Sequence, residues 1–187
     1  MKSNSVSCLI LAGGESKRMN HVDKGLVQFN SLPLIGHVIN ALQNQVDDFV
    51  ISANRNFEQY QQFSSTVIPD NGEKHGPLSG IAAALPACKH EHILIVPCDM
   101  PYLPGNLLST LLNNFKHSNI AIIEVHKRQQ LVFLMHKSLL PSLREHLSTG
   151  QYKLMQWIKT HSPTIVNCND MAHAFKNINS THELNQL

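Results

Sequence analysis

An apolar run near the start of the chain ends at a pair of glycines, and it constrains the fold more than any other feature. The run covers residues 6–11, and Ala12-Gly13-Gly14 follows it directly. A short apolar run of this kind predicts a strand buried inside a parallel sheet. The two glycines let the backbone turn sharply and approach a ligand closely. We therefore expect a first strand that ends in a ligand-binding loop.

Two cations, Arg18 and Lys24, follow this loop. Backbone N–H groups of a glycine loop hold phosphate oxygens, and fixed cations offset their charge, so the combination favours a triphosphate site. The loop matches neither the Walker pattern nor the dinucleotide fingerprint, because Arg18 stands where the latter needs its third glycine. Taken singly, each cation would more readily be a solvated surface charge.

Strand-like and helix-like stretches alternate along the rest of the chain. Further short apolar runs predict strands over residues 50–52, 66–68, 93–96, 120–125 and 131–135. Apolar residues at helical spacing predict helices over residues 34–46, 108–115 and 140–147. Further helical stretches are expected over residues 81–85, which Pro77 precedes near the helix start, and over residues 152–159. This alternation predicts an α/β fold of three layers, with helices on both sides of a doubly wound, mostly parallel sheet. No linker or repeat divides the chain, so we expect a single domain over residues 1–187.

The composition narrows the class of protein. With 42% hydrophobic and 15% charged residues over 187 positions, the chain is typical of a globular protein with one sizeable core. A formal net charge of +2 does not favour nucleic acid as a partner. No apolar run is long enough to span a bilayer, so we expect no membrane partner. Lys17-Arg18 closely follows the first apolar run, which argues against a secretory signal.

The cysteines and histidines predict neither disulfides nor a metal centre. The four cysteines have no Cys-x-x-Cys spacing and stand at positions 8, 88, 98 and 168. Two of them lie in apolar strand-like runs, so we expect buried reduced thiols and a cytoplasmic protein. His90-Glu91-His92 has no third ligand nearby, and a solvated loop is the better interpretation of that segment.

Polar side chains follow the carboxyl ends of the expected strands, where open α/β sheets bind their ligands. Ser52 ends the second strand, Asp70 follows the third, and Asp99 follows the fourth. Prolines at positions 97 and 101 stiffen the turn around Asp99. A rigid carboxylate suits Mg²⁺, which shares oxygen ligands with substrate phosphates. From position alone, a helix or turn cap is almost as good an interpretation of Asp99.

These motifs resemble those of the molybdenum cofactor guanylyltransferase family. The family's opening pattern Leu-Ala-Gly-Gly, Arg-Met and Asp-Lys-Gly-Leu matches residues 11–14, 18–19 and 23–26, and its Pro-Cys-Asp-x-Pro pattern matches residues 97–101. The resemblance extends from about residue 8 to about residue 185. It implies a Rossmann-like nucleotidyltransferase fold. It also implies transfer of GMP from GTP to the phosphate of Mo-molybdopterin, which gives molybdopterin guanine dinucleotide and pyrophosphate.

The resemblance also implies roles for individual residues. Arg18, Lys24 and Asp99 become the catalytic candidates, with Mg²⁺ held by Asp99. The residues implied to bind GTP are Leu11, Ala12, Gly13, Gly14, Lys24, Ser52, Asp70 and Asp99. The residues implied to lie on the molybdopterin side are Gly76, Gly80, Asn177 and Asn179. The segment from Gly76 to Gly80 is equally typical of a helix entry, and the segment after residue 175 is equally typical of a turn before a capped helix.

The chain departs from the family's pattern at several places. Asn20-His21 follows Arg-Met where the family usually has Gly, and Ser180-Thr181 replaces Thr-Pro. Asn tolerates positive φ better than most residues, which suits the first replacement. A proline common near residues 129–131 and an arginine common within residues 150–153 are absent. The last two departures concern the acceptor side more than the GTP side.

Other functions fit the same pattern less well. One alternative is a sister nucleotidyltransferase that uses CTP and gives molybdopterin cytosine dinucleotide, or that uses a sugar phosphate as acceptor. Such enzymes commonly carry Leu-Ala-Ala-Gly in place of residues 11–14. A non-catalytic molybdenum-cofactor carrier would not need the rigid carboxylate of Asp99 beside Lys24. The expected partners are GTP and Mo-molybdopterin, with other molybdenum-cofactor biosynthesis proteins and recipient apo-molybdoenzymes as further candidates.

Overall fold

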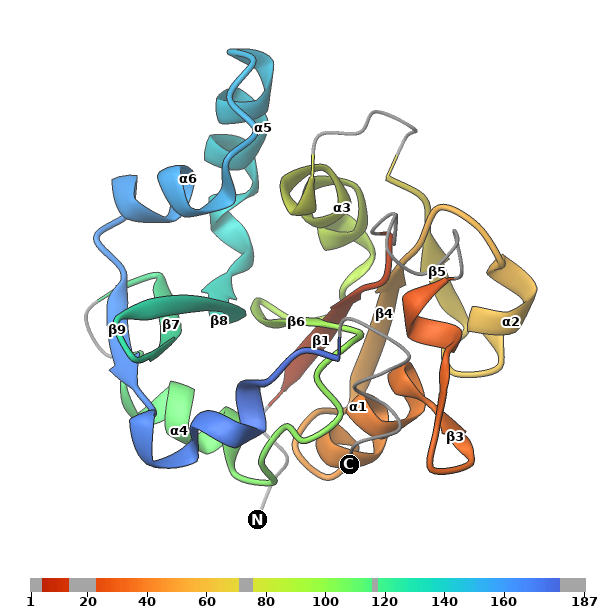
Figure 1. The fold of residues 1–187 in the computed structure, drawn as a ribbon. Helices are drawn as coiled ribbons and strands as arrows, with labels where there is room; N and C mark the ends of the chain where they lie inside the picture. Colours follow the sequence, from red (N-terminus) through yellow and green to blue (C-terminus); the bar gives the residue numbers. More distant parts are fainter. Residues whose placement is uncertain (1–4, 14–22, 71–75, 116–117, 179–187) are drawn as a thin grey trace.

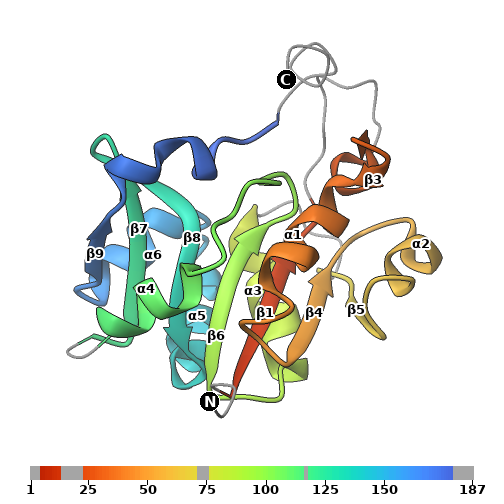
Figure 2. The same cartoon turned by 90° about the horizontal axis from the view of Figure 1, so that it is seen from below.

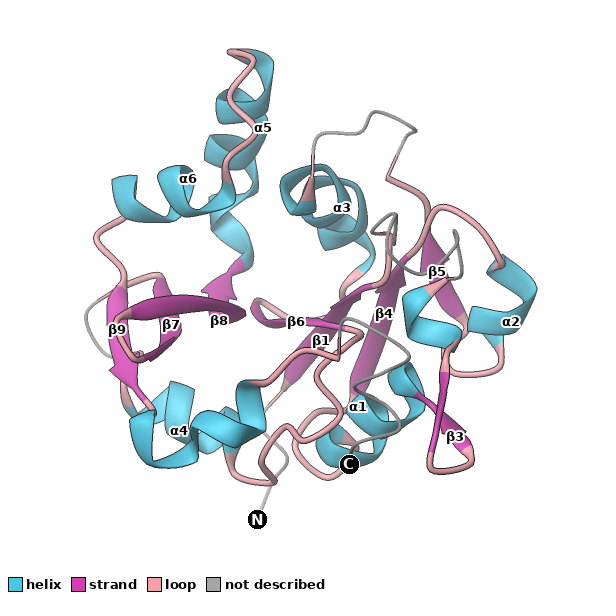
Figure 3. Ribbon diagram, in the orientation of Figure 1, coloured by secondary structure: helices cyan, strands magenta, loops and turns pink. Residues whose placement is uncertain are grey.

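The computed structural model describes residues 5–13, 23–70, 76–115 and 118–178, which build a sheet with helices on both faces (Figure 1; Figure 3). The seven strands follow the order β5-β4-β1-β6-β8-β7-β9 across the sheet. Their bounds are β1 Val6–Leu11, β4 Asp48–Ser52, β5 Thr66–Ile68, β6 His92–Pro97, β7 Ile120–Val125, β8 Arg128–His136 and β9 Thr164–Asn167. Among them only β8 runs antiparallel to its neighbours, β6 and β7. The mostly parallel sheet expected from the sequence is therefore confirmed.

Strand β1 lies in the parallel half of the sheet, paired with β4 on one side and β6 on the other. Both of its faces are covered, which explains its nearly continuous apolar sequence. Cys8 and Ile10 belong to the core on one face, whereas Leu9 belongs to the core on the other. This alternation is the expected period of two for a strand.

The helices form the outer two layers. Figure 2 shows α1 and α4 in front of the sheet and α3, α5 and α6 behind it. Their bounds are α1 Leu34–Leu42, α3 Pro77–Ala84, α4 Leu107–Asn113, α5 Leu140–Ser148 and α6 Leu154–Thr160. The apolar side chains of α1 and α4 share one core, which also holds Tyr60 of α2 (Phe57–Gln61). Those of α3, α5 and α6 share the other core. The three layers are thus a helix layer, the sheet and a second helix layer.

Several short elements differ from the sequence expectations. The helix expected over residues 34–46 ends at Leu42, and Val46 is buried from a turn that follows it. The edge strand β9, the hairpin β2 (Gln28–Phe29) and β3 (Leu32–Pro33), and the 3-10 turns η2 (Lys24–Leu26), η3 (Leu85–Ala87), η4 (Lys137–Leu139) and η5 (Asn169–Phe175) were not expected. Most of these segments have only two to four residues, too few to show a periodic pattern in the sequence.

A buried polar cluster ties together the amino ends of the central strands. The Ser7 hydroxyl donates to Oδ2 of Asp48 at 2.5 Å, and the backbone N–H of Lys89 donates to the same oxygen at 2.9 Å. Ser7 Oγ accepts from the N–H of His90 at 3.1 Å. Burial acts to raise the pKa of the Asp48 carboxyl, but the hydrogen bonds from Lys89 and Ser7 outweigh it, so the pKa lies below its ordinary value. The ionised carboxylate therefore links β1, β4 and the entry to β6.

The cysteines are all free and buried, as expected. The segment at residues 90–92 is a loop at its first two positions, where Glu91 is exposed as expected, but not at the third. His90 is partly buried and pairs with Asp47 at 2.8 Å, and His92 already belongs to β6, where its ring packs edge-on against Phe115. Across the described residues, no helix has both the length and the apolar character needed to cross a membrane.

Candidate active site

The carboxyl ends of β1, β4, β5 and β6 meet at one edge of the sheet, because these four strands are parallel. Backbone pairing continues for one residue into the loops. The N–H groups of Ala12, Ala53 and Cys98 donate to the carbonyls of Ser52, Ile68 and Leu11, at 2.8, 3.1 and 3.1 Å. The loops that carry Gly13, Asp70 and Asp99 are therefore held side by side.

Lys24 and Asp99 make direct contact at this edge. Lys24 begins the turn η2, and its Nζ lies 2.5 Å from Oδ2 of Asp99. The two side chains are only 19% and 10% exposed. The other carboxylate oxygen, Oδ1 of Asp99, is buried and has no hydrogen-bond partner among the described residues. A buried carboxylate oxygen without a donor is costly unless a cation meets it, so this atom marks a place where a cation fits.

The described part of the chain offers no ready-made cage of metal-binding side chains. No group of three His, Cys, Asp or Glu side chains that could hold a metal ion occurs there. A cation at Asp99 would therefore depend on water or on oxygens of a bound substrate for part of its shell. Mg²⁺ binds in this way, through one or two carboxylates and substrate phosphates.

The residue before Lys24 sits in a second polar cluster. Asp23 is buried, and its carboxylate accepts hydrogen bonds from the Tyr60 hydroxyl and from Nδ2 of Asn56, the latter at 3.0 Å. Arg55 Nε lies 3.4 Å from the same carboxylate. Burial raises the pKa of the Tyr60 hydroxyl far above its ordinary value, and the neighbouring Cys98 and Asp23 act in the same direction. Tyr60 therefore stays protonated and acts as the donor.

Gly25, on the other side of Lys24, leaves no room for a side chain. A Cβ at this position would lie 2.6 Å from the Tyr60 hydroxyl oxygen and 3.3 Å from Cβ of Cys98. The turn η2 consequently packs with its backbone directly against Tyr60. This close approach explains why a glycine follows Lys24.

The residues expected on the GTP side lie around the first loop. A Cβ on Gly13 would approach the side chains of Asn54 and Asp70, at 3.2 and 3.5 Å, and the N–H of Asp70 donates to Oδ1 of Asn54 at 3.0 Å. Oδ1 of Asp70 is buried without a partner among the described residues. Ser52 is buried beneath Gly80, where a Cβ would lie 2.6 Å from its hydroxyl. The binding roles of these residues stay predictions.

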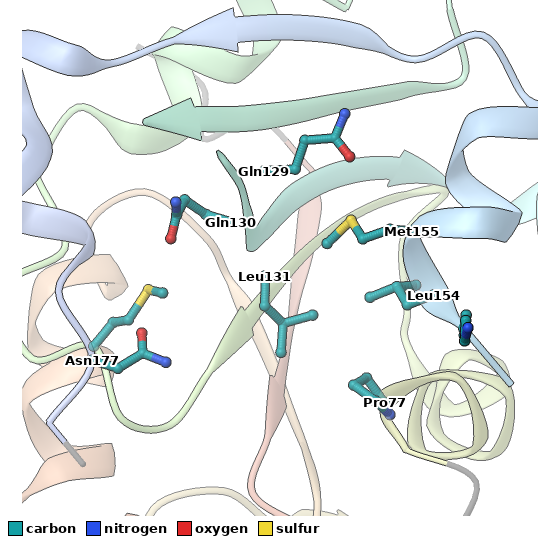
Figure 4. A pocket seen from close by; sticks show the side chains of 9 residues that line it. Pro77, Gln129, Gln130, Leu131, Leu154, Met155 and Asn177 are labelled. Carbon is teal, nitrogen blue, oxygen red and sulfur yellow. The ribbon is translucent and has the colours of Figure 1, made fainter. Parts of the chain in front are cut away.

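Of the residues expected on the molybdopterin side, Asn177 lines a separate cavity of about 540 Å³, whereas Gly80 packs against Ser52 and lines no part of it. Figure 4 shows Asn177 and Gln130 on one side of it and Leu154 and Met155 on the other. Its lining consists of Pro77, Met100, Gln129, Gln130, Leu131, Lys153, Leu154, Met155 and Asn177. The N–H of Ile178 donates to the carbonyl of Asp99 at 3.0 Å, which places Asn177 beside the segment that carries Asp99. Gly76, with φ of 72°, directly precedes Pro77.

Three expected site residues fall outside the described residues, namely Gly14, Arg18 and Asn179. Other residues of the site were missed by the sequence analysis. Asn54 lies two residues after Ser52, the end of β4, so its position just after a strand was a signal that could have identified it. Asn56 and Tyr60 carried no signal, because their importance lies in a contact with Asp23 that is more than thirty positions away in the chain.

Comparisons with known proteins decide the family. The MobA-like NTP transferase domain matches residues 8–165. The molybdenum cofactor guanylyltransferase of Aliivibrio fischeri is 35% identical over 189 residues, which cover 100% of this chain and 97% of the relative. The enzyme of that name from Shewanella frigidimarina is 37% identical over 186 residues, covering 97% and 95%. This chain belongs to the molybdenum cofactor guanylyltransferase family. As a member of this family it is a nucleotidyltransferase.

Solved structures place the guanylyltransferase in a broader fold. The molybdopterin-guanine dinucleotide biosynthesis protein A of Archaeoglobus fulgidus has a TM-score of 0.77 at 19% identity, over 96% of this chain and 95% of that one. A CMP:2-keto-3-deoxy-manno-octonic acid synthetase complexed with CTP has a TM-score of 0.72 at 12% identity, covering 98% and 96%. Both show the expected Rossmann-like nucleotidyltransferase fold. Because a CTP complex shares it, the fold alone does not select the base.

Proposed function

We propose that this guanylyltransferase transfers GMP from GTP to the terminal phosphate of Mo-molybdopterin, giving molybdopterin guanine dinucleotide and pyrophosphate. The observation that carries the proposal is the contact between Lys24 and Asp99, at the sheet edge where the family's two most specific motifs meet. A binding module would not need a buried carboxylate with one oxygen paired to a cation and the other left for a second cation. The geometry therefore favours catalysis over carriage of the cofactor.

The chemistry requires positioning and charge more than a general base. The phosphate of molybdopterin is ionised at neutral pH, so it can attack the α-phosphate of GTP without losing a proton. The transition state carries its charge on the phosphate oxygens, and it is stabilised by cations fixed in advance. Lys24 supplies one such cation, held in place through Asp99. Arg18 would add a second, at the position that the family motif assigns to it.

The free oxygen of Asp99 fits a magnesium ion. Asp99 would bind Mg²⁺ through Oδ1, the buried atom that lacks a partner among the described residues. When bound, Mg²⁺ supplies positive charge that offsets the charge of the triphosphate. Lys24 then orients the carboxylate, since its ammonium already occupies Oδ2.

The nucleotide would lie over the ends of β1, β4 and β5. The backbone from Leu11 to Gly13 would face the phosphates and base. Asp70, whose buried Oδ1 has no donor among the described residues, would accept from a ribose hydroxyl or from guanine N–H groups. Asn54 is fixed against the backbone of Asp70, so it would support the same contact.

The molybdopterin would lie in the cavity beside Asn177. The amides of Gln129, Gln130 and Asn177 offer both donors and acceptors, as the edge of a pterin ring requires. Met155 and Leu131 provide an apolar wall against which the ring can pack. Lys153 would offset negative charge on the acceptor, in a segment where the family often carries an arginine.

The domain organisation, the cellular location and the further partners of the chain follow from the same proposal. The chain would act as a single domain in the cytoplasm, where the reduced state of its buried cysteines would be kept. Other molybdenum-cofactor biosynthesis proteins would deliver the acceptor, and apo-molybdoenzymes would receive the product.

The test compares nucleotide binding and turnover. Calorimetry with GTP, CTP and ATP in the presence of Mg²⁺ is expected to show selective GTP binding that Lys24→Ala weakens strongly but leaves measurable. Lys159→Ala is the control, because Lys159 is exposed on α6. With Mo-molybdopterin added, the wild type is expected to release pyrophosphate. Selective CTP binding would replace GTP by CTP as the donor, and binding without pyrophosphate release would indicate a carrier.

A further inference from the structure

A buried tyrosine touches the residues on both sides of Lys24. The side chain of Tyr60 is 0% exposed, and its hydroxyl donates to the carboxylate of Asp23, the residue before Lys24. The same oxygen lies 2.6 Å from where a Cβ of Gly25, the residue after Lys24, would stand. The backbone that carries Lys24 is thus fixed against one hydroxyl group.

The segment around Tyr60 supplies further donors to the same carboxylate. Asn56 Nδ2 bonds Asp23 at 3.0 Å and Arg55 Nε approaches it at 3.4 Å. These residues form one short stretch between the end of β4 and α2. Asp23 therefore anchors the turn η2 to a single neighbouring segment, and a charged hydrogen-bond acceptor makes that anchor strong.

We infer that Tyr60 is a positioning residue, which holds the turn η2 through Asp23 and Gly25 so that the ammonium of Lys24 lies against Asp99. The inference rests on the proposed function for its catalytic consequence, because Lys24 is there the cation that meets the triphosphate. The contact between Lys24 and Asp99 itself is part of the structure and does not depend on that function.

Two substitutions isolate the hydroxyl from the rest of the side chain. Tyr60→Phe keeps the buried ring and removes only the donor to Asp23. Asn56→Gly removes a second donor from an exposed residue, and glycine keeps the left-handed conformation that Asn56 adopts with φ of 54°. The matched control is Ser7→Ala, which also removes a buried hydroxyl from an aspartate, but at the amino end of the sheet.

The first measurement reads the position of Lys24 without any nucleotide. Acetic anhydride acetylates amines, and mass spectrometry gives the rate at Lys24 relative to the exposed Lys159 in the same sample. An ammonium held against a carboxylate reacts slowly. We expect several-fold faster acetylation of Lys24 in Tyr60→Phe, a smaller increase in Asn56→Gly, and the wild-type rate in Ser7→Ala. A wild-type rate in Tyr60→Phe would overturn the inference, whatever the protein binds.

The second measurement reads the consequence for the nucleotide. We expect Tyr60→Phe to weaken binding of Mg²⁺-GTP about tenfold, the effect of losing one charged hydrogen bond, and to leave affinity unchanged when Lys24→Ala is already present. A merely structural tyrosine would instead lower affinity equally in both backgrounds, which would contradict the inference. If the wild type binds no GTP while acetylation of Lys24 still depends on Tyr60, the proposed function fails and the positioning role stands.

Discussion

At the scale of single residues, the site contains pairs of side chains in which one side chain fixes the position of the other. Asp99 has one oxygen on Lys24 and one that faces no donor among the described residues. Removing one partner of a buried ion pair leaves an uncompensated charge, so each member depends on the other. Asp23 depends on Tyr60 through a hydrogen bond, because loss of the hydroxyl would take a donor away from a buried carboxylate.

Asp99→Asn tests the carboxylate charge at nearly constant shape. We expect turnover to fall by a factor on the order of a thousand, because the amide keeps an acceptor for Lys24 but binds a divalent cation poorly. Pyrophosphate release as a function of Mg²⁺ concentration measures this loss. Circular dichroism is expected to show an intact fold, and near-normal turnover would remove Asp99 from the mechanism.

Gly25→Ala tests the close approach of η2 to Tyr60. A methyl group 2.6 Å from the hydroxyl oxygen must displace the turn, so we expect a loss of about 1–3 kcal/mol in the free energy of unfolding and weaker GTP binding. Urea unfolding and calorimetry measure the two effects. Gly105→Ala is the matched control, since a Cβ there meets nothing within 4 Å. Equal stability of the two variants would contradict the packing argument.

Sequence patterns predicted the site residues that directly follow strands. They did not predict the residues that act through contacts with distant parts of the chain. Asp99 was predicted because it follows a recognisable apolar run and lies between two prolines. Tyr60 was not, because a tyrosine in a short helix has no local feature that distinguishes a core residue from a donor to Asp23. Such pairs become visible only when the fold brings their segments together.

At the scale of elements, the two ends of β1 carry different kinds of polar contact. Its carboxyl end opens into the ligand loop, whereas Ser7 near its amino end is buried in the cluster with Asp48. The central strands were predicted because their burial on two faces gives continuous apolar runs. The edge strand β9 has only four residues and one neighbour, β7, so its sequence alone carried too little pattern.

The Asp48 cluster predicts a pH dependence of stability. The folded-state pKa of Asp48 is lowered, so its stabilisation is fully present above the unfolded-state pKa, near 3.8, and is lost as pH falls through the folded value. At pH 7 we expect Asp48→Asn to lower the free energy of unfolding by about 1–3 kcal/mol. Urea unfolding from pH 7 to pH 3 should show this difference shrinking. Glu145→Gln, at an exposed position on α5, serves as control, and a constant difference for Asp48→Asn would contradict the assignment.

At the scale of the whole molecule, different strands of the sheet border the two proposed binding regions. The parallel strands β5, β4, β1 and β6 carry the proposed nucleotide side, and β8 borders the acceptor cavity together with α6. Helix alternation predicted the layers, because each helix has one apolar face. It did not predict that β8 runs antiparallel, since the direction of a strand follows from its connections and not from its composition.

The layered packing predicts that the cysteines are inert in the folded protein. Burial raises the pKa of all four thiols above the ordinary value, so almost no thiolate is present at about neutral pH. We expect Ellman's reagent to modify none of them before unfolding and all of them in urea. Rapid modification of one thiol in the folded protein would show that one of the two cores opens locally.

The hydrogen bond from Ile178 to the carbonyl of Asp99 sets the order in which the site can be completed during synthesis. The strands from β1 to β6 leave the ribosome first and can pair before the rest of the chain has been translated. The segment that braces Asp99 is translated some eighty residues later. A nascent chain that already holds the proposed nucleotide loops therefore still lacks the brace beside the acceptor cavity, and acquires it only when translation has passed Ile178.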